Sequence, residues 1–408
     1  MRKLIFAIWL TLFSCNLSVA QKDTYYPFVA EIQLNDRLQI QVTASLPKLD
    51  AITPITIKNG KEVYQLSVKK RISDTIVYQF PGQDAEWRIA FDKDFSDARG
   101  WWINYNKKVP VRYPIHLHSG FLELPAPEVN EANISGRWRV IFAPGTPNEE
   151  TLVGVFEQEI GNFVSGSFLS ETGDYRYLHG YISEGKLHLQ TYTGYWAFMV
   201  AATLQNNDQM SGNFYSGASY NVPFTALRDT SVQLRDESSL TYLIKRDETV
   251  QLKGLTKLNG RKVNLDLNKQ NQVTLIQIMG TWCPNCIDES QLLIDLQKEY
   301  GDNGLRVIGL AFEVGINSKT QRARLTKFAK ELGINYELYL AGTSSKEAAA
   351  AYFPMLNGIM SFPTSILVDS QGKVIAIHTG FSGPATGPAY EELVKKFKQE
   401  IEGALLGN

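Results

Sequence analysis

The chain has 408 residues, 44% of them hydrophobic and 20% charged, and this length predicts two or three domains with ordinary cores. Because 41 Lys and Arg residues nearly balance 42 Asp and Glu residues, the formal net charge of -1 offers no field for attracting nucleic acid or an anionic membrane. The contents of 31 Gly and 16 Pro are near average and exclude a collagen-like repeat and general disorder.

Residues 1–20 predict an export signal. Arg2 and Lys3 form a positive start, residues 4–13 form an apolar run that is too short to span a bilayer, and small residues at 18–20 suit cleavage. We therefore expect the mature protein to work outside the cytoplasm, in the periplasm or an equivalent compartment. No later stretch is apolar for long enough to predict a transmembrane helix.

Cys15 offers a second interpretation of the same segment. The residues that end at Cys15 suit a lipoprotein signal, in which this cysteine would become the lipidated first residue and anchor the protein to a membrane. Phe13 is bulky for its position in such a motif, so a cleaved signal is the preferred prediction. The two interpretations differ in whether the protein is soluble or tethered.

Two β-rich regions follow the signal. Residues 21–130 contain short apolar segments separated by polar, Gly and Pro turns, which is typical of an antiparallel β domain of sandwich or barrel-like form. Residues 131–230 show this pattern at the spacing expected of a small barrel, and the Pro-rich stretch 124–127 suits a joint between the regions. Residues 231–250 are polar with little periodicity and predict a linker.

The second β region is rich in aromatic residues, which admit two interpretations. They could line a barrel mouth or a protein-binding face, but cross-strand pairing and core filling are the simpler expectation. These residues are Tyr175, Tyr177, Tyr181, Tyr192, Tyr195, Trp196, Phe198, Phe214 and Tyr215. In the first region His116 and His118 alternate on one strand face, but two ligands do not make a metal site, so we expect ordinary polar positions.

Residues 251–408 change to the pattern of an α/β domain. Two nearly continuous apolar runs predict strands buried on both faces, and segments with apolar residues at helical spacing accompany them. The expected order is strand, helix, strand, helix, hairpin and helix, over 273–279, 283–300, 305–312, 318–332, 366–377 and 388–405. The sequence therefore predicts a multidomain protein with an N-terminal all-β part and a C-terminal α/β domain.

Cys283 and Cys286 are the only cysteines left once the predicted signal is removed. They directly follow a predicted buried strand and open a helix, the context in which two cysteines three apart form a redox pair. Unpaired N–H groups and the macrodipole at the helix N-terminus favour an anionic sulfur, so Cys283 is the expected nucleophile. Pro284 suits the first helical turn, and Cys286, one turn later, can attack the mixed disulfide that Cys283 forms with a substrate.

Three other uses of this pair have weaker support. A zinc site needs four ligands, and neither a second cysteine pair nor suitably spaced histidines accompany the motif, so no metal is expected. A purely structural disulfide would close a very small loop and constrain the unfolded chain little. A peroxidatic cysteine is a further option, although Gly280 rather than Thr lies three residues before Cys283 and no obvious Arg partner is present.

Residues 252–406 resemble the thioredoxin-fold disulfide reductases of the TlpA and ResA kind. The resemblance rests on residues 280–286, which read GTWCPNC, on Glu289, and on residues 361–364, which read SFPT before a strand. It implies a thioredoxin-like domain and reversible dithiol–disulfide exchange in the cell envelope. It also implies disulfide-containing envelope proteins as substrates, a membrane protein as thiol electron donor, and no cofactor besides the redox-active Cys283–Cys286 disulfide.

The resemblance also assigns a substrate groove. In thioredoxin folds the proline at the position of Pro363 is cis and faces the cysteine pair, and the backbone of Phe362 would then pair with an extended substrate segment, as in strand addition. Trp282 and Pro284 complete the expected groove. Phe362 is bulkier than the residue usual there, which indicates either an apolar substrate patch or core packing.

One departure from the family concerns proton transfer. Thioredoxin has a buried Asp six residues before the first cysteine, which assists proton transfer at the second thiol, whereas this chain has Gln277. Because Gln cannot accept the proton, Glu313, at the end of a predicted strand, or Glu289, on the first helix, would have to serve as the base. Either of them could instead be a solvated surface residue.

We therefore expect an exported thiol-disulfide oxidoreductase, most simply a reductase of protein disulfides in the envelope. The dipeptide between the cysteines does not fix the direction of electron flow, since known pairs span about -270 to -120 mV, so a disulfide oxidase or isomerase is an alternative. A second alternative, from another class, is a binding or scaffold protein in which the β domains hold a partner and the C-terminal domain acts as a redox-controlled clasp.

Overall fold

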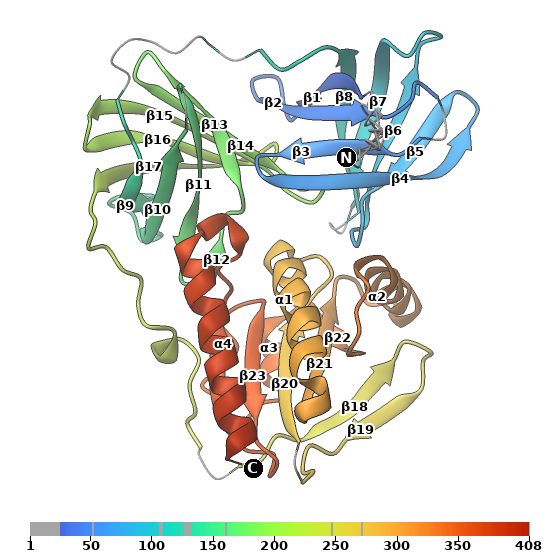
Figure 1. Ribbon diagram of the computed structural model, residues 1–408, viewed down its shortest axis with the longest axis vertical. Helices are drawn as coiled ribbons and strands as arrows, with labels where there is room; N and C mark the ends of the chain where they lie inside the picture. The colour runs from blue at the N-terminus through green and yellow to red at the C-terminus, as the bar shows by residue number, and fades with distance from the viewer. Residues whose placement is uncertain are drawn as a thin grey trace, which may run out of the picture.

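The computed structural model describes residues 25–50, 53–105, 109–123, 125, 132–159, 161–245, 248–270 and 272–407. The predicted export signal with Cys15, and the Pro-rich joint except for Pro125, lie outside these ranges. Figure 1 shows two β bodies side by side above an α/β domain. Among the helices in these ranges, none is long and apolar enough to cross a membrane.

The first β domain is a closed barrel of antiparallel strands, drawn in blue tones in Figure 1, and is called the first barrel below. Each strand pairs with its sequence neighbours, and the last strand returns to pair with the first. The strands are β1 (Tyr26–Gln33), β2 (Gln39–Leu46), β3 (Ile55–Asn59), β4 (Glu62–Ile72), β5 (Thr75–Gln79), β6 (Ala85–Phe91), β7 (Asp97–Asn104) and β8 (Val111–Ser119). Side chains alternate between the core and the outside, most regularly along β2, so each strand contributes one apolar face to the interior.

The second β domain, called the second barrel, is also closed. Its strands are β9 (Gly136–Phe142), β10 (Glu150–Gln158), β11 (Phe163–Ser170), β12 (Gly173–Asp174), β13 (Leu178–Ser183), β14 (Lys186–Tyr192), β15 (Ala197–Asn206), β16 (Gln209–Ser216) and β17 (Tyr220–Arg228). Pairing of β10 with β11 and of β17 with β9 closes the sheet, and the short β12 adds to the end of β11. In Figure 1, β12 lies at the side of this barrel that faces the α/β domain.

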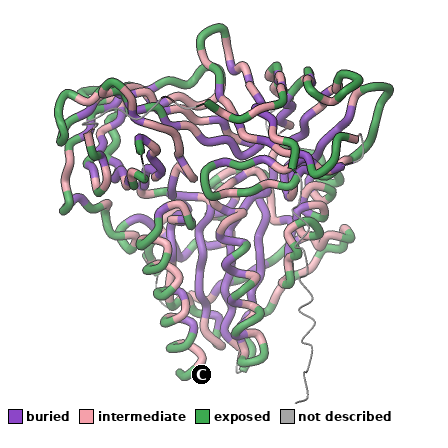
Figure 2. Tube along the Cα trace, turned by 45° about the horizontal axis from the view of Figure 1, so that its top comes forward, coloured by how far each residue is buried: buried purple, intermediate pink, exposed green. Residues whose placement is uncertain are grey.

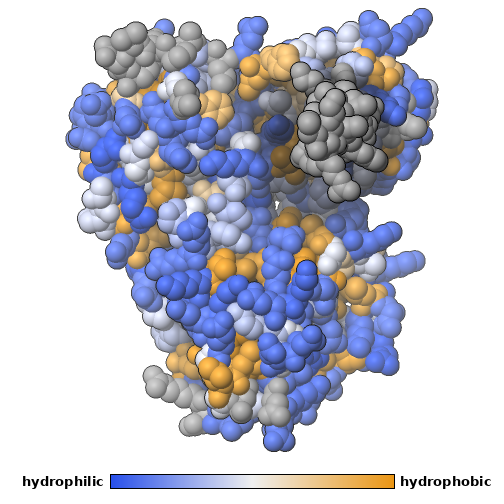
Figure 3. All heavy atoms as spheres, viewed as in Figure 1, coloured by the Kyte–Doolittle hydropathy of each residue, from blue (hydrophilic) through white to orange (hydrophobic). Residues whose placement is uncertain are grey.

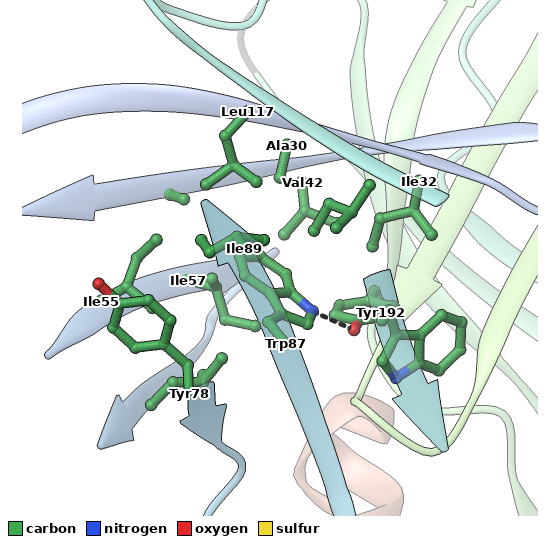
Figure 4. Packing of buried hydrophobic residues seen from close by; sticks show 14 of the residues in the cluster. Ala30, Ile32, Val42, Ile55, Ile57, Tyr78, Trp87, Ile89, Leu117 and Tyr192 are labelled. Atoms are coloured by element: carbon green, nitrogen blue, oxygen red, sulfur yellow. Dashed lines mark hydrogen bonds between the residues drawn. The ribbon is translucent and has the colours of Figure 1, made fainter. Parts of the chain in front are cut away.

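The two barrels share one hydrophobic core at their junction. Tyr192 of the second barrel is buried among first-barrel residues, and its hydroxyl accepts a hydrogen bond of 2.7 Å from Nε1 of Trp87 (Figure 4). Nε1 of Trp102 likewise donates to the Gly194 carbonyl at 2.8 Å. Gly194 has a φ of 80°, and the ring of Phe80 occupies the space that a Cβ would need, so only glycine fits this contact.

The C-terminal domain is a mixed sheet in the order β19-β18-β22-β21-β20-β23-β24 with four helices. Its strands are β18 (Leu252–Lys257), β19 (Lys262–Leu265), β20 (Val273–Met279), β21 (Leu305–Glu313), β22 (Glu337–Thr343), β23 (Thr364–Val368) and β24 (Val374–Thr379). Its helices are α1 (Pro284–Tyr300), α2 (Ser318–Leu332), α3 (Lys346–Ala350) and α4 (Pro388–Leu406), with short 3-10 turns η1 (Glu237–Ser239), η2 (Gly301–Asn303) and η3 (Pro384–Thr386) in the chain. The core residues place α1, α2 and α4 against one face of the sheet and α3 against the other, so that the central strands are buried on both faces (Figure 2).

The predicted order starts at β20 and omits the β18–β19 hairpin before it, and it also lacks two later elements, β22 and α3. The strand β22 has only three consecutive buried residues, 338–340, and α3 is five residues long. Segments of this length do not carry a period that separates strand from helix. The predicted order is therefore incomplete between α2 and the β23–β24 hairpin.

The segment predicted as a linker also packs against the C-terminal domain. The Ile244 N–H donates to the Met355 carbonyl at 2.8 Å, and the Tyr242 N–H donates to Oδ1 of Asn357 at 2.8 Å. The Asn357 side chain in turn donates to the Leu240 carbonyl at 2.9 Å. These hydrogen bonds hold the connection along the surface of the domain that it leads to.

Both barrels contact the end of the C-terminal domain where α1 begins. On the side of the first barrel, the Gly82 N–H donates to Glu331 of α2 at 2.6 Å, and Arg324 of α2 pairs with Asp84 at 2.9 Å. Contacts from β12 and its flanking residues lie on the other side and are described below. The face in Figure 3 is mostly hydrophilic with small separate hydrophobic patches, which fits a chain whose main apolar surfaces are buried in its cores.

Candidate active site

Cys283 and Cys286 lie at the N-terminus of α1, directly after the buried strand β20. Cys283 is the N-cap of the helix, and its Sγ accepts a hydrogen bond of 3.3 Å from the Cys286 N–H. Pro284 occupies the first turn, where its missing N–H costs no helical hydrogen bond. Both cysteines are free thiols, but Cys283 is 5% exposed whereas Cys286 is 0% exposed. Only the first sulfur is therefore within reach of another molecule.

The predicted groove residues surround Cys283. The Phe362–Pro363 bond is cis, as expected, and the Phe362 carbonyl accepts a hydrogen bond of 3.4 Å from the Cys283 thiol. The rings of Trp282 and Phe362 lie 5.3 Å apart, and Phe362 also packs on Phe312 at 5.9 Å. Phe362 thus packs against the core, as one of the two interpretations expected, and it also borders a pocket.

Glu289 lies in the core beneath the cysteines. It is fully buried, which excludes the surface position that the sequence left open. Its carboxylate accepts hydrogen bonds from Nε2 of Gln277 at 2.8 Å and from Oγ of Ser365 at 2.9 Å. Burial raises the pKa of Glu289 to about 7, although these hydrogen bonds act in the opposite direction. This carboxyl group can therefore hold or release a proton near neutral pH.

Cys286 is connected to this carboxyl group through Gln277, whose side chain also donates to the Cys286 carbonyl at 3.2 Å. Burial raises the pKa of the Cys286 thiol well above its ordinary value, and the neighbouring Cys283 and the charge of Glu289 act in the same direction. Cys286 is thus a neutral thiol at physiological pH. A nearby base would have to remove its proton before it could attack a disulfide.

Glu313, the third candidate for proton transfer, binds Thr281 rather than the residues around Cys286. It ends β21 and is buried, and its carboxylate accepts hydrogen bonds from the Thr281 N–H at 2.8 Å and from Oγ1 of Thr281 at 2.7 Å. Burial raises the pKa of Glu313. The surface interpretation is wrong here too, because Glu313 fixes the turn that leads into the cysteine motif. The structure thus brings Glu289 and Gln277 to Cys286, and Glu313 to Thr281.

The second barrel supplies residues that the sequence did not assign to the site. The side chain of Asn285, between the cysteines, donates to the Asp174 carbonyl and to the Phe381 carbonyl, both at 3.2 Å. Oγ of Ser361, two residues before Pro363, donates to the Thr172 carbonyl at 2.8 Å. The segment around β12 therefore lies directly beside the cysteine motif.

A pocket of about 380 Å³, called the site pocket below, opens between this segment and the cysteine motif. It reaches Cys283 and Pro284 on the side of the C-terminal domain. Its aromatic lining comes from both domains and consists of Tyr175, Trp196, Phe198, Trp282 and Phe362. Three of the aromatic residues of the second β region thus border this pocket, while others, such as Tyr192 and Phe214, fill cores as expected.

A buried arginine joins the three domains next to the motif. Arg176 follows β12 and donates to the Pro284 carbonyl at 3.1 Å and to the carboxylate of Asp288 on α1. Its guanidinium also pairs with Glu62 and donates to the hydroxyl of Tyr64 at 3.3 Å, both on the first barrel. Burial raises the pKa of Asp288 to about 7, while Arg176 acts to lower it. We refer to these five residues as the Arg176 cluster.

The histidines predicted as ordinary polar positions lie on the first barrel. His116 and His118 share one face of β8, where His116 pairs with Asp97 and lies 3.8 Å from Glu31. Over the part of the chain that the structure describes, no group of three or more His, Cys, Asp or Glu side chains is placed to hold a metal ion.

Comparison with known proteins places the C-terminal domain in a family. The family model described as Redoxin matches residues 242–394, which include the cysteine motif and Pro363. The thiol-disulfide oxidoreductase ResA of Bacillus thuringiensis subsp. konkukian is 30% identical over 143 residues, which are 35% of this chain and 72% of that protein. The thiol:disulfide interchange protein DsbE of Haemophilus influenzae is 29% identical over 153 residues, 37% of this chain and 74% of that protein.

Among solved structures, a thiol:disulfide interchange protein of the thioredoxin family from Chlorobium tepidum is 21% identical. The match covers 39% of this chain and 99% of that one, with a TM-score of 0.29. The family model covers the domain that carries Cys283, Cys286 and the cis proline. The chain is therefore an enzyme of the ResA-like thiol-disulfide oxidoreductase family, with a thioredoxin-like redoxin domain at its C-terminal end.

Proposed function

We propose that this oxidoreductase is an exported reductase of protein disulfides in the cell envelope, with Cys283 as nucleophile and Cys286 as resolving cysteine. The observation that carries the proposal is the asymmetry of the two sulfurs. Cys283 caps the helix and borders the site pocket, whereas Cys286 is fully buried one turn further on. A disulfide can therefore meet the first sulfur but not the second.

The reaction follows from this arrangement. The Cys283 thiolate attacks one sulfur of the substrate disulfide, a mixed disulfide forms, and the other substrate sulfur leaves as a thiolate. The Cys286 thiol then loses its proton to Glu289 and attacks the sulfur of Cys283, which releases the second substrate thiolate and leaves a Cys283–Cys286 disulfide. Two electrons pass from the enzyme to the substrate, and a membrane thiol protein returns them in a later exchange.

The trapping of mixed disulfides tests this assignment. In a Cys286→Ser variant, substrates should accumulate on Cys283, since the attack that releases them is lost. Such adducts should appear on non-reducing gels of envelope extracts, disappear with dithiothreitol, and be absent from the Cys283→Ser, Cys286→Ser double variant. If the single and double variants give the same pattern, the assignment of the two roles is wrong.

The direction of electron flow needs its own measurement. A reductase should have a reduction potential nearer to the value of about -270 mV of thioredoxin than to that of about -120 mV of the strong oxidant DsbA. Equilibration of the purified protein with dithiothreitol or glutathione buffers gives this number directly. A value near that of DsbA would reverse the proposed direction and support a disulfide oxidase.

Replacement of Glu289 with glutamine tests the proposed base. At pH 7 we expect the resolving step to slow about 100-fold, because glutamine cannot accept the Cys286 proton. In the unchanged enzyme this step should speed up as the pH rises through about 7, where the Glu289 carboxyl ionises. In the variant, the rise should occur only at alkaline pH, where the Cys286 thiol loses its proton unaided. Stopped-flow kinetics of a preformed mixed disulfide between about pH 5 and pH 10 measure both rates.

The matched control is Glu299→Gln on the exposed side of α1. This variant should keep the rate and the pH profile of the unchanged enzyme. Glu299 lies at the opposite end of α1 from the cysteines, where its exposed side chain pairs with Lys398. If Glu289→Gln has the same profile as Glu299→Gln, the proton of Cys286 leaves by another route.

The scaffold alternative has one supporting observation, the direct contact of the second barrel with the motif through Asn285 and Ser361. A redox-controlled clasp would bind its partner with or without an active Cys283. Partner binding that survives Cys283→Ser, combined with no turnover of any disulfide substrate, would favour the clasp over the reductase.

A further inference from the structure

The site pocket is built from two domains that meet at the nucleophile. Trp282 and Phe362 form the wall on the C-terminal domain, and their rings lie 5.3 Å apart. Tyr175, Trp196 and Phe198 form the wall on the second barrel, where Phe198 lies 5.6 Å from Trp196 and 5.9 Å from Tyr175. The barrel wall is thus a continuous aromatic surface, and all five aromatic residues are partly exposed.

No charged side chain in the lining of the site pocket is exposed enough to meet a substrate. The charged lining residues, Asp174 and Arg176, are both buried and engaged with other groups. The Asp174 carboxylate accepts hydrogen bonds from the Arg176 N–H at 2.6 Å and from the Gly383 N–H. The two terminal nitrogens of the Arg176 guanidinium pair with Asp288 and Glu62. The rest of the lining consists of the five aromatic residues with Cys283, Pro284, Gly173 and the uncharged polar residues Ser170, Thr172 and Asn285. This lining favours an apolar side chain over a charged one.

Cys283 is only slightly accessible from the site pocket. The sulfur belongs to a residue that is 5% exposed, and the site pocket of about 380 Å³ is near the lower end of the range of about 300–1,000 Å³ typical of small-ligand sites. Beside it, the segment around β12 covers part of the groove. A Cβ added to Gly380 would lie 2.7 Å from the Thr172 carbonyl carbon, so the two backbones are in close contact. Because so little of Cys283 is exposed, an extended segment reaches its sulfur more readily than a rigid folded surface does.

We propose that the second barrel makes the site pocket a specificity pocket for disulfides in extended polypeptide segments, in which the reacting cysteine is next to an aromatic or large aliphatic residue. Trp196 and Phe198 are the residues that contact this neighbouring side chain while Cys283 attacks the disulfide. The inference rests on the proposed function and adds the substrate class. The family model matches residues 242–394, a range that does not include the second barrel.

The test uses pentapeptides with a central cysteine whose sulfur is joined to 5-thio-2-nitrobenzoate. Attack by the Cys283 thiolate on the peptide sulfur forms the enzyme–peptide disulfide and releases the coloured thiolate. Four peptides carry Gly on both sides of the cysteine, Phe before it, Phe after it, or Lys in the better of the two Phe positions. With the full-length enzyme, we expect the better Phe peptide to react about tenfold faster than the Gly and Lys peptides.

The same ratio is then measured in variants of the barrel wall. Trp196→Ala and Phe198→Ala should each lower the Phe-to-Gly ratio about fivefold or more. The ratio compares two peptides on one protein preparation, so partial loss of folded enzyme cancels. The matched control is Trp101→Ala on β7 of the first barrel, a tryptophan that is 47% exposed and distant from the site pocket, and it should keep both the ratio and the rates. If Trp196→Ala does not fold, Phe198→Leu is used with the same expectation of a lowered ratio.

Three outcomes decide the inference. A Phe preference that both wall variants reduce and Trp101→Ala retains supports it. Rapid exchange without preference among the peptides, or a preference that persists in folded Trp196→Ala and Phe198→Ala, overturns the specificity pocket and leaves the reductase intact. Failure of every peptide to release the coloured thiolate overturns the proposed function together with the inference.

Discussion

Cys283→Ser is expected to lower the rate of thiol–disulfide exchange by more than about 1,000-fold. Serine cannot form a disulfide, and its hydroxyl is not ionised near neutral pH, so the covalent intermediate is lost. The second cysteine cannot replace the first, because Cys286 is 0% exposed and its thiol is neutral at physiological pH. Helix capping should survive, since the serine oxygen can accept the same N–H that the sulfur accepts.

The measurement is the steady-state reduction of a protein disulfide with dithiothreitol as electron donor. Cys286→Ser is the matched control, since it should form the mixed disulfide at a normal rate and then stop, whereas Cys283→Ser should not form it. Mass spectrometry of the alkylated protein identifies which sulfur carries the substrate. Turnover by Cys283→Ser above a tenth of the normal rate would show that another group is the nucleophile.

The sequence predicts the C-terminal domain well because its signals are local. The apolar run of β20 is buried at every position, and the predicted helix at 318–332 coincides with α2, which begins after the N-cap Asn317 and ends at Gly333. The motif is equally local, since Cys283 is the N-cap of α1 and Pro284 and Cys286 lie in its first turn. Periodicity fails for short elements, as in β18, β19, β22 and α3.

The rest of the site depends on contacts between residues that are far apart in the chain. Arg176 meets Asp288 at a separation of 112 residues, and Ser361 meets Thr172 at a separation of 189 residues. No spacing rule relates such positions, so the share of the second barrel in the site could not be predicted from the sequence. The burial of Glu289 could not be predicted from the sequence either, because charged side chains are rarely fully buried unless they are paired. Its partners, Gln277 and Ser365, come from β20 and β23.

Arg176→Met should produce the largest loss of stability, about 3–5 kcal/mol in the transition that separates the second barrel from the C-terminal domain. The Arg176 side chain is 6% exposed, and its removal leaves Asp288 and Glu62 in the interface without their cation. Methionine keeps a similar length but donates no hydrogen bond, so the Pro284 carbonyl also loses the hydrogen bond from Arg176. Because that carbonyl lies between the two cysteines, exchange at Cys283 should slow as the interface opens.

The loss should depend on pH in a defined direction. A carboxyl group whose pKa is raised in the folded state binds its proton more tightly there than in the unfolded state, so stability falls as the pH rises through that pKa. The pKa of Asp288 is about 7 with Arg176 present and should rise further without it. The difference between Arg176→Met and the unchanged protein should therefore be smaller at about pH 5, where Asp288 is protonated in both, than at about pH 8.

Urea unfolding at these two pH values measures the difference, and Arg235→Met provides the matched control. Arg235 pairs with Glu171 at the surface and is 68% exposed, so its replacement should cost far less. The pKa of Glu171 is lowered, mainly by its hydrogen bond from Arg235, so this pair is ionised at both pH values and its effect should change little between them. The prediction is wrong if the two variants lose equal stability, or if the loss of stability of Arg176→Met does not grow with pH. Either result would mean that solvent reaches the Arg176 cluster and that other contacts hold the barrels beside the cysteines.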